Sequence, residues 1–147
     1  MTLRERIGTF ILKIISIINI KIQRVTKGKW AGSFIGRAPI GVLTTTGRKS
    51  GLAREAALMF YQDGDDVVVV ASKFGMPHNP AWYLNILDDA HVSFEWRAVK
   101  RPYRARVANE TERARLWPEL VRHYGHYEKY QARAPREIPV VICSPVS

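Results

Sequence analysis

The first 26 residues follow a helical period rather than a strand period. Apolar side chains recur every three or four residues, which places them on one face of a helix. The stripe consists of Leu3, Ile7, Phe10, Ile11, Ile14, Ile18, Ile22 and Val25. Its many isoleucines lower helix propensity, so a strand in the middle is the alternative. The pattern predicts an amphipathic helix within residues 1–28.

Two positions are open to that helix: packed on its own domain, or resting on anionic lipid with its cations at the headgroups. A membrane span requires roughly 20 mostly apolar residues. Lys13 and Lys21 interrupt the stripe before that length. No small-residue cleavage site follows, so a secretory signal is not expected.

Beyond this helix, short apolar runs alternate with turn residues. A glycine-rich loop is predicted at 28–41, and DGDD at 63–66 is a hairpin signal. The valines of 67–70 predict a strand buried on both faces. Strands are predicted at 41–46, 54–62, 67–72, 91–96, 101–109 and 136–146, and helices at 81–89 and 110–124. Asn109 is the expected N-cap of the second helix, with Glu112 completing a capping box.

Strands outnumber helices, and hairpins join most successive strands. This order describes an antiparallel α+β domain, a barrel-like sheet with covering helices. The 147 residues are enough for one core. We expect an N-terminal helix over 1–28 and one barrel domain over 29–147.

Charge is unevenly distributed along the chain. The net charge is +10, and the first 54 residues hold eleven of the 23 Lys and Arg but one of the 13 acidic residues. The asymmetry indicates a localised anionic partner, such as a membrane surface, a phosphorylated cofactor or an RNA. Cys143 is the single cysteine, which excludes an intramolecular disulfide and a cysteine-rich metal site.

The densest basic segment is TGRKSGLAR, residues 46–54. Its glycines permit a tight turn with inward N–H groups, and Arg48, Lys49, Ser50 and Arg54 add further donors. Converging N–H dipoles, a hydroxyl and fixed cations are what a phosphate requires. The glycine spacing is not that of a Walker loop. The alternatives are an anion site and an ordinary basic hairpin tip.

A second segment, ASKFGMPHNPAWYLN at 71–85, follows the valine strand. A hydroxyl, a cation and aromatics at a strand end suit a flat conjugated ligand. His78 is either a general base or, more commonly for a lone loop histidine, a solvated side chain.

A third segment carries Tyr124, Tyr127 and Tyr130 at a spacing of three, which places them on one helical face. They form either core packing or an aromatic wall with hydroxyls toward a substrate. HExxH, G-x-S-x-G and strand-linked GxGxxG motifs are absent, as is any metal-ligand spacing. What remains is an enzyme whose cofactor carries the chemistry.

In this order, LTTTGRKSG, VVVVASKFGMPHNPAWYLN and YGHYEKYQARAPREIPVV closely resemble the deazaflavin-dependent nitroreductase and quinone reductase family of actinobacteria. The resemblance runs from about Gly36 to Pro145. It implies an antiparallel split β-barrel of the FMN-binding type, with coenzyme F420, an 8-hydroxy-5-deazaflavin, as cofactor and no metal.

The resemblance also implies roles for individual residues. The phosphate and acidic tail of F420 would be held by Thr46, Gly47, Arg48, Lys49, Ser50 and Arg54, with Lys29 and Arg37 as weaker additions. The deazaflavin ring would be lined by Ala71, Ser72, Lys73, Pro77, His78, Asn79, Trp82 and Tyr83. The substrate pocket would comprise Phe60, Tyr61, Tyr124, Tyr127 and Tyr130. The catalytic hydrogen-bond donors would be Ser72, Tyr124, Tyr127 and Tyr130.

The implied reaction is hydride transfer from reduced F420 to a menaquinone-like quinone or another electrophile, with nitroaromatic reduction as a side activity. Phe74, Ala134, Pro135 and Ala53 depart from the family pattern, which affects the acceptor range more than the cofactor. The alternatives are an FMN-dependent reductase on the same fold, a non-enzymatic F420, flavin, haem or biliverdin carrier, and a basic RNA- or membrane-binding protein.

A location in the cytoplasm is expected, with peripheral contact at the inner face of the membrane as a hypothesis. No nucleic-acid partner is expected, and the oligomeric state stays open.

Overall fold

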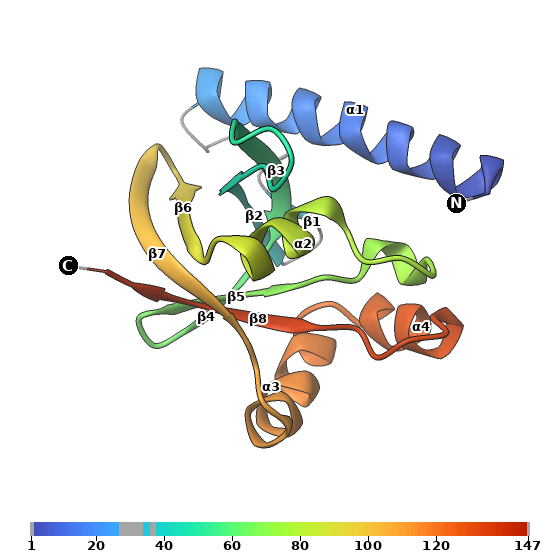
Figure 1. The fold of residues 1–147 in the computed structure, drawn as a ribbon. Coiled ribbons are helices and arrows are strands. Elements are labelled where there is room, and N and C mark those ends of the chain that lie inside the picture. Colours follow the sequence, from blue (N-terminus) through green and yellow to red (C-terminus); the bar gives the residue numbers. More distant parts are fainter. Residues whose placement is uncertain (1, 27–33, 36–37, 147) are drawn as a thin grey trace.

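Eight antiparallel strands form one curled sheet, and helices cover it (Figure 1). This computed structural model describes residues 2–26, 34–35 and 38–146. The strands run in the order β1-β2-β6-β7-β8-β5-β4, and β3 also pairs with β2. They are β1 (Phe34–Ile35), β2 (Ala38–Thr46), β3 (Ala53–Met59), β4 (Tyr61–Asp63), β5 (Asp66–Val70), β6 (His91–Trp96), β7 (Val99–Val107) and β8 (Val140–Pro145). The helices are α1 (Leu3–Thr26), the 3₁₀ turn η2 (Lys73–Gly75), α2 (Ala81–Asp88), α3 (Glu110–His123) and α4 (His126–Arg133).

The predicted α+β split barrel is confirmed, with two corrections to its strands. The single strand expected at 54–62 is divided at Phe60, because β3 pairs with β2 whereas β4 pairs with β5. Phe60 itself is buried, and its N–H donates to the Pro39 carbonyl at 3.1 Å. The loop expected through residue 41 already becomes strand at Ala38. Gly41 lies within that strand, paired with Leu58 of β3, and it has no side chain there because a Cβ would lie 2.3 Å from the Phe94 ring.

Strand β5 is buried on both faces of the sheet, which explains why its sequence is continuously apolar. Val67 and Val69 enter a core cluster with Leu43, Phe94 and Tyr103. Val68 and Val70 enter a second cluster on the other face, against α3 and α4. Alternate valines therefore serve different cores, and the predicted doubly buried strand is confirmed.

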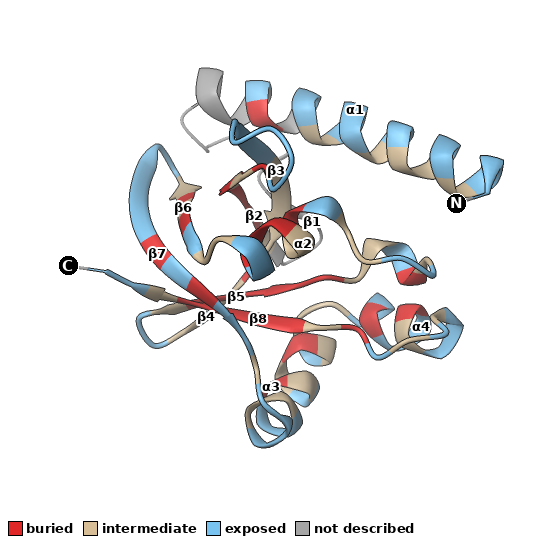
Figure 2. Ribbon diagram, viewed as in Figure 1, coloured by how far each residue is buried: buried red, intermediate tan, exposed pale blue. Residues whose placement is uncertain are grey.

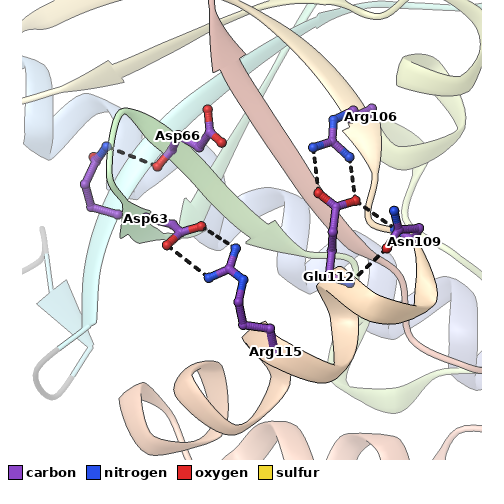
Figure 3. Close-up of polar contacts among 7 residues, drawn as sticks. Asp63, Asp66, Arg106, Asn109, Glu112 and Arg115 are labelled. Carbon is purple, nitrogen blue, oxygen red and sulfur yellow. Dashed lines mark hydrogen bonds and ion pairs between the residues drawn. The ribbon is translucent and has the colours of Figure 1, made fainter.

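Charged contacts fix α3 to the edge of the sheet (Figure 3). Asn109 caps the helix by accepting from the Glu112 N–H at 2.8 Å, and the Glu112 carboxylate accepts from the Asn109 N–H at 3.1 Å. Arg106 of β7 donates two bonds to that carboxylate, at 2.6 and 2.7 Å. Arg115 donates to Asp63 of β4 at 2.8 and 3.3 Å. The predicted capping box is confirmed, and it also serves as an anchor between helix and sheet.

The N-terminal helix turns one side toward the domain and leaves the described part of its apolar stripe exposed (Figure 2). Ser16 accepts a 2.7 Å hydrogen bond from the Ala57 N–H of β3, and Gly8 approaches Met76 closely. Ile20 is buried, but Leu3, Ile7, Phe10, Ile11, Ile14, Ile15, Ile17 and Ile18 are 41–73% exposed. The helix is confirmed. Its packing on the domain combines the buried Ile20 with the small residues Gly8 and Ser16, which allow the close approach to β3 and the 73–78 loop.

Candidate functional site

The basic segment forms a tight turn between β2 and β3. The Gly47 N–H donates to the Leu52 carbonyl, and the Gly51 N–H donates to the Gly47 carbonyl, both at 2.8 Å. The Ser50 hydroxyl accepts from the Leu52 N–H and from Arg54, both at 3.2 Å. Arg48, Lys49 and Arg54 are exposed around this turn. The arrangement presents fixed cations to solvent at one point of the molecule, as an anion site requires.

Asn85 of α2 anchors this turn, and sequence reasoning did not single it out. The buried Asn85 amide donates to the Thr45 hydroxyl at 3.1 Å. Its carbonyl oxygen accepts from the Arg48 N–H at 3.1 Å and from the Arg48 guanidinium at 3.4 Å. Asn85 thus satisfies polar groups that the turn brings against the core. The sequence signal for this role was the position of Asn85, an amide within an otherwise apolar helix.

The loop of residues 71–79 leaves β5 and returns to α2. Lys73, Phe74 and Gly75 have positive φ angles of 43°, 56° and 75°. A Cβ on Gly75 would lie 2.5 Å from the Tyr130 carbonyl oxygen, so the loop touches the α4 backbone there. The Phe74 ring meets the Tyr130 ring edge to face at 5.6 Å. The loop and α4 therefore form one packed unit.

Arg136, just before β8, binds the inner side of this loop. It donates to the carbonyls of Ala71, Ser72, Met76 and His78 at 3.0–3.4 Å and to the Asn79 side chain at 2.7 Å. Burial lowers the pKa of its guanidinium. The Ser72 hydroxyl does not cap η2. Arg136 has no predicted role in the sequence motif that contains it, because its partners lie some 60 positions earlier.

Lys73 and His78 face the first turn of α1. Burial lowers the pKa of Lys73, while nearby Glu5 acts in the opposite direction and Arg136 adds to the lowering. His78 is exposed, and its Nε2 lies 3.6 Å from the Glu5 carboxylate. The N-terminal helix therefore covers one side of the predicted ring loop (Figure 1).

The three tyrosines separate into a pair and a core residue. Tyr124 and Tyr130 place their hydroxyls 3.1 Å apart, although Tyr124 precedes α4 rather than lying on it. Burial, followed by the bond with Tyr124, raises the pKa of Tyr130, so that its hydroxyl keeps its proton at neutral pH. Tyr127 is 5% exposed and packs in the second core beside Trp117. Its assignment to the pocket wall stays a prediction.

Phe60 and Tyr61 point to opposite faces of the sheet. Tyr61 contacts His123 on the side of the tyrosines. Phe60 packs on Phe94 and Trp96 inside the curl. There it lines a hollow of about 270 Å³. Of the predicted site residues that the structure describes, Phe60 is the only one that lines this hollow. The lining consists of Phe60, Gln62, Val67, Phe94, Trp96, Arg97, Val99, Arg101 and Tyr103.

Contacts link the three predicted segments into a continuous arc, which consists of the basic turn, α2, the 71–79 loop and α4. Asn85 of α2 binds Arg48 of the basic turn. The 71–79 loop comes just before α2 in the chain, and it contacts Tyr130 of α4 at Gly75. Within the arc, Trp82 is core, Tyr83 is half-buried, Pro77 is exposed and Asn79 binds Arg136. Lys29 and Arg37 lie outside the described residues. Among the described residues, no three His, Cys, Asp or Glu side chains gather closely enough to hold a metal ion.

Comparison with known proteins gives consistent similarities. The family model described as F420H(2)-dependent quinone reductase matches residues 16–145. The F420H(2)-dependent quinone reductase Rv1261c of Mycobacterium tuberculosis is 31% identical over 143 residues, covering 95% of this chain and 93% of its own. Rv3178 of the same organism is 39% identical over 107 residues, covering 73% of this chain and 90% of its own.

A solved F420-H2 dependent reductase, FDR-A, superposes with a TM-score of 0.67 at 37% identity. The match covers 72% of this chain and 94% of that chain. The family-model match, over residues 16–145, includes both the barrel and the segments of the arc.

Proposed function

The chain belongs to the F420H(2)-dependent quinone reductase family, and from that premise we propose that it transfers a hydride from reduced coenzyme F420 to a quinone. It is accordingly an oxidoreductase. The observation that carries the proposal is the arc, in which one short helix, α2, joins a basic turn to a loop beside a tyrosine pair.

The residues of the arc fit the chemistry of the cofactor. F420 carries a phosphodiester and a tail of glutamates, and the exposed Arg48, Lys49 and Arg54 are suitable partners for these anions. Lys73 and Arg136 add positive charge at the loop. The ring would lie against the 71–79 loop and the first turn of α2, where Ser72, Asn79 and Tyr83 offer polar atoms. These placements remain assignments by position and chemistry.

Reduced F420, when bound, supplies a hydride as a two-electron donor. The chain's own task is to hold an acceptor in place and to stabilise negative charge that develops on its oxygen. Tyr130 keeps its proton, so a hydroxyl of the Tyr124–Tyr130 pair acts as a hydrogen-bond donor rather than as a base. The Ser72 hydroxyl is a second donor. Solvent then provides the proton that completes reduction.

Menaquinone-like quinones are the acceptors that we propose, with nitroaromatics as side substrates. A flat apolar ring suits the aromatic surface of Phe74, Tyr124 and Tyr130, in which the Tyr130 ring contacts the other two rings. Phe74 is 42% exposed and stands at the outer side of this group. Replacing it by glycine would widen the approach, so nitroaromatic turnover is expected to respond more than menadione turnover.

The test is oxidation of reduced F420 by menadione, followed through recovery of the deazaflavin absorbance. We expect protein-dependent recovery that weakens in Lys49→Ala and Arg54→Ala through a higher KM for F420. Lys100→Ala, which removes an exposed cation from β7, is the matched control. F420 binding without turnover of any quinone, enone or nitroaromatic would support a carrier instead. Equal binding of FMN would support the FMN-dependent alternative.

We also propose that α1 rests on an anionic bilayer at the inner face of the cell membrane. Eight large apolar side chains are exposed along this one helix. Apolar side chains scattered singly over a surface are common, but a contiguous group of this kind marks an interaction site. Exposed Arg4, Arg6, Lys13 and Lys21 come from the same helix and complement anionic headgroups. Among the described helices, none has the length and apolarity to cross a membrane. The opposite side of α1 contacts the 73–78 loop, so this docking would bring a lipid-soluble quinone near the site.

Co-sedimentation with vesicles tests the docking. Vesicles containing phosphatidylglycerol should bind the protein, and phosphatidylcholine vesicles should bind it more weakly. Ile11→Ser with Ile14→Ser should abolish binding, whereas Leu87→Ser with Val99→Ser removes two exposed apolar side chains elsewhere and should not. If the α1 variant instead halves the mass of the protein in solution, a second copy covers the face and the lipid proposal is wrong.

A further inference from the structure

We propose that Arg136 is a positioning residue for cofactor binding: its guanidinium holds the 71–79 loop in the shape that receives the deazaflavin ring. This inference rests on the proposed function, because that function assigns the loop to the ring. Arg136 is placed behind the loop, on the connection between α4 and β8, so it acts through the backbone of the loop and needs no contact with the ring itself.

The five bonds of Arg136 span the whole loop. The guanidinium reaches Ala71 and Ser72, where the loop leaves β5, and Met76, His78 and Asn79, where it turns toward α2. The shortest, at 2.7 Å, goes to the Asn79 side chain. A guanidinium has five N–H donors in a fixed plane, so it can fix several acceptors at once. Lysine offers three donors around one point and cannot reproduce that plane.

The loop needs such support because its backbone is strained. Lys73 and Phe74 carry side chains at positive φ, the left-handed region in which a Cβ crowds its own backbone. Within the turn, the Gly75 N–H donates to the Ser72 carbonyl at 2.8 Å, and the Met76 N–H donates to the Lys73 carbonyl at 3.0 Å. These two bonds close η2 but do not fix it to the barrel. Arg136 ties both ends of η2 to the β8 side of the sheet.

The charge of Arg136 strengthens the argument for a ligand at this place. All five described acceptors are neutral, four carbonyls and one amide, so they orient the cation without cancelling its charge. The half-buried Lys73 lies close enough to respond to it electrostatically. The Glu5 carboxylate lies near Lys73 and offsets part of this charge, but the two cations together leave the loop positive, which favours an anionic occupant over a neutral one.

The experiment compares Arg136→Lys with Arg106→Lys in the full chain. Arg106 also makes bidentate bonds, but to Glu112 at the α3 anchor, away from the arc. Titration with oxidised F420 gives the Kd, and hydrogen exchange of the ligand-free protein reports the Gly75 and Met76 amides. We expect Arg136→Lys to raise the Kd for F420 about tenfold, because the loss of one charge-assisted hydrogen bond corresponds to a change of that size. The two loop amides should exchange faster while the β5–β8 amides keep their wild-type rates.

Arg136→Ala and Asn79→Ala complete the design. Added guanidinium should lower the Kd of Arg136→Ala toward the wild-type value, and Asn79→Ala should give a smaller rise than Arg136→Lys. Wild-type Kd in Arg136→Lys, or faster exchange throughout the sheet, would overturn the inference. If the wild-type protein fails to bind F420, the proposed function is wrong, while loop exchange still decides whether Arg136 holds the loop.

Discussion

Asn85 and Arg136 show how single residues join segments that are distant in sequence. Asn85 links α2 to the basic turn, and Arg136 links the β8 connection to the loop after β5. Spacing along the chain identified the segments that they join, because glycines, cations and aromatics cluster locally. It did not identify the links, because a hydrogen bond across some 40 or 60 positions leaves no periodic signal.

Asn85→Ala should uncouple the basic turn from α2. The Thr45 hydroxyl and the Arg48 N–H would lose their partner, at a cost of about 1–3 kcal/mol in unfolding free energy. The turn would also be less fixed, so the Kd for F420 should rise. Urea denaturation and F420 titration measure the two effects. Asp88→Ala, on the exposed side of the same helix, should change neither, and an unaltered Kd in Asn85→Ala would separate the turn from cofactor binding.

Glu112 should make part of the stability depend on pH. Its bonds with Arg106, and then with the Asn109 N–H, lower the pKa of its carboxyl from 4.5 to about 2. A depressed folded-state pKa stabilises the protein above pH 4.5, and this stabilisation is lost as the pH falls toward about 2. Glu112→Gln should therefore have a lower urea midpoint than wild type at pH 7, with the difference shrinking in acid.

Glu110→Gln is the control for this pH effect, because it removes an acid from the same first turn of α3. Its midpoint should shift less at pH 7. A gap between wild type and Glu112→Gln that stays constant from pH 7 to pH 2.5 would show that the carboxylate's charge is not responsible.

At the scale of elements, the sequence predicted most strands and all the long helices, and the two corrections have local causes. The 54–62 run looks like one strand because its apolar character is unbroken at Phe60, yet the pairing partner changes there. The side on which α1 packs was equally hidden. Periodicity identifies the apolar stripe of a helix but does not say which side of the helix packs on the domain. Here α1 packs through the side that carries Gly8 and Ser16, because these small residues allow close approach.

Gly75→Ala should separate the 71–79 loop from α4. The added Cβ would meet the Tyr130 carbonyl oxygen at 2.5 Å, in addition to the strain of a φ of 75°. Gly64→Ala provides the comparison, because Gly64 has a φ of 61° but open space around its Cβ position. Both variants should lose about 1–2 kcal/mol from backbone strain. Gly75→Ala should lose more, and it alone should weaken F420 binding.

Thermal unfolding and F420 titration of the two alanine variants check this prediction. Equal losses of stability, together with equal Kd values, would mean that the loop can move away from α4 without consequence for the site.

For the whole molecule, the uneven distribution of charge predicts a salt-dependent affinity. The whole net charge of +10 arises in the first 54 residues, which include the basic turn. Raising NaCl from about 50 to about 300 mM should weaken F420 binding about threefold or more, because exposed charges are screened. Longer glutamate tails should steepen the dependence, and Lys49→Ala with Arg54→Ala should flatten it. FMN, which has a phosphate but no such tail, should show little change; salt-independent F420 binding would contradict an electrostatic role for the turn.

The pairing of β5 with β8 has a consequence for how the protein is made. β5 is complete by residue 70, yet its partner runs from Val140 to Pro145, so its four valines leave the ribosome long before that edge can be closed. An open apolar strand edge is a template for aggregation. We therefore expect the nascent chain to be most prone to aggregation before β8 emerges. The same late step brings Arg136 to the 71–79 loop.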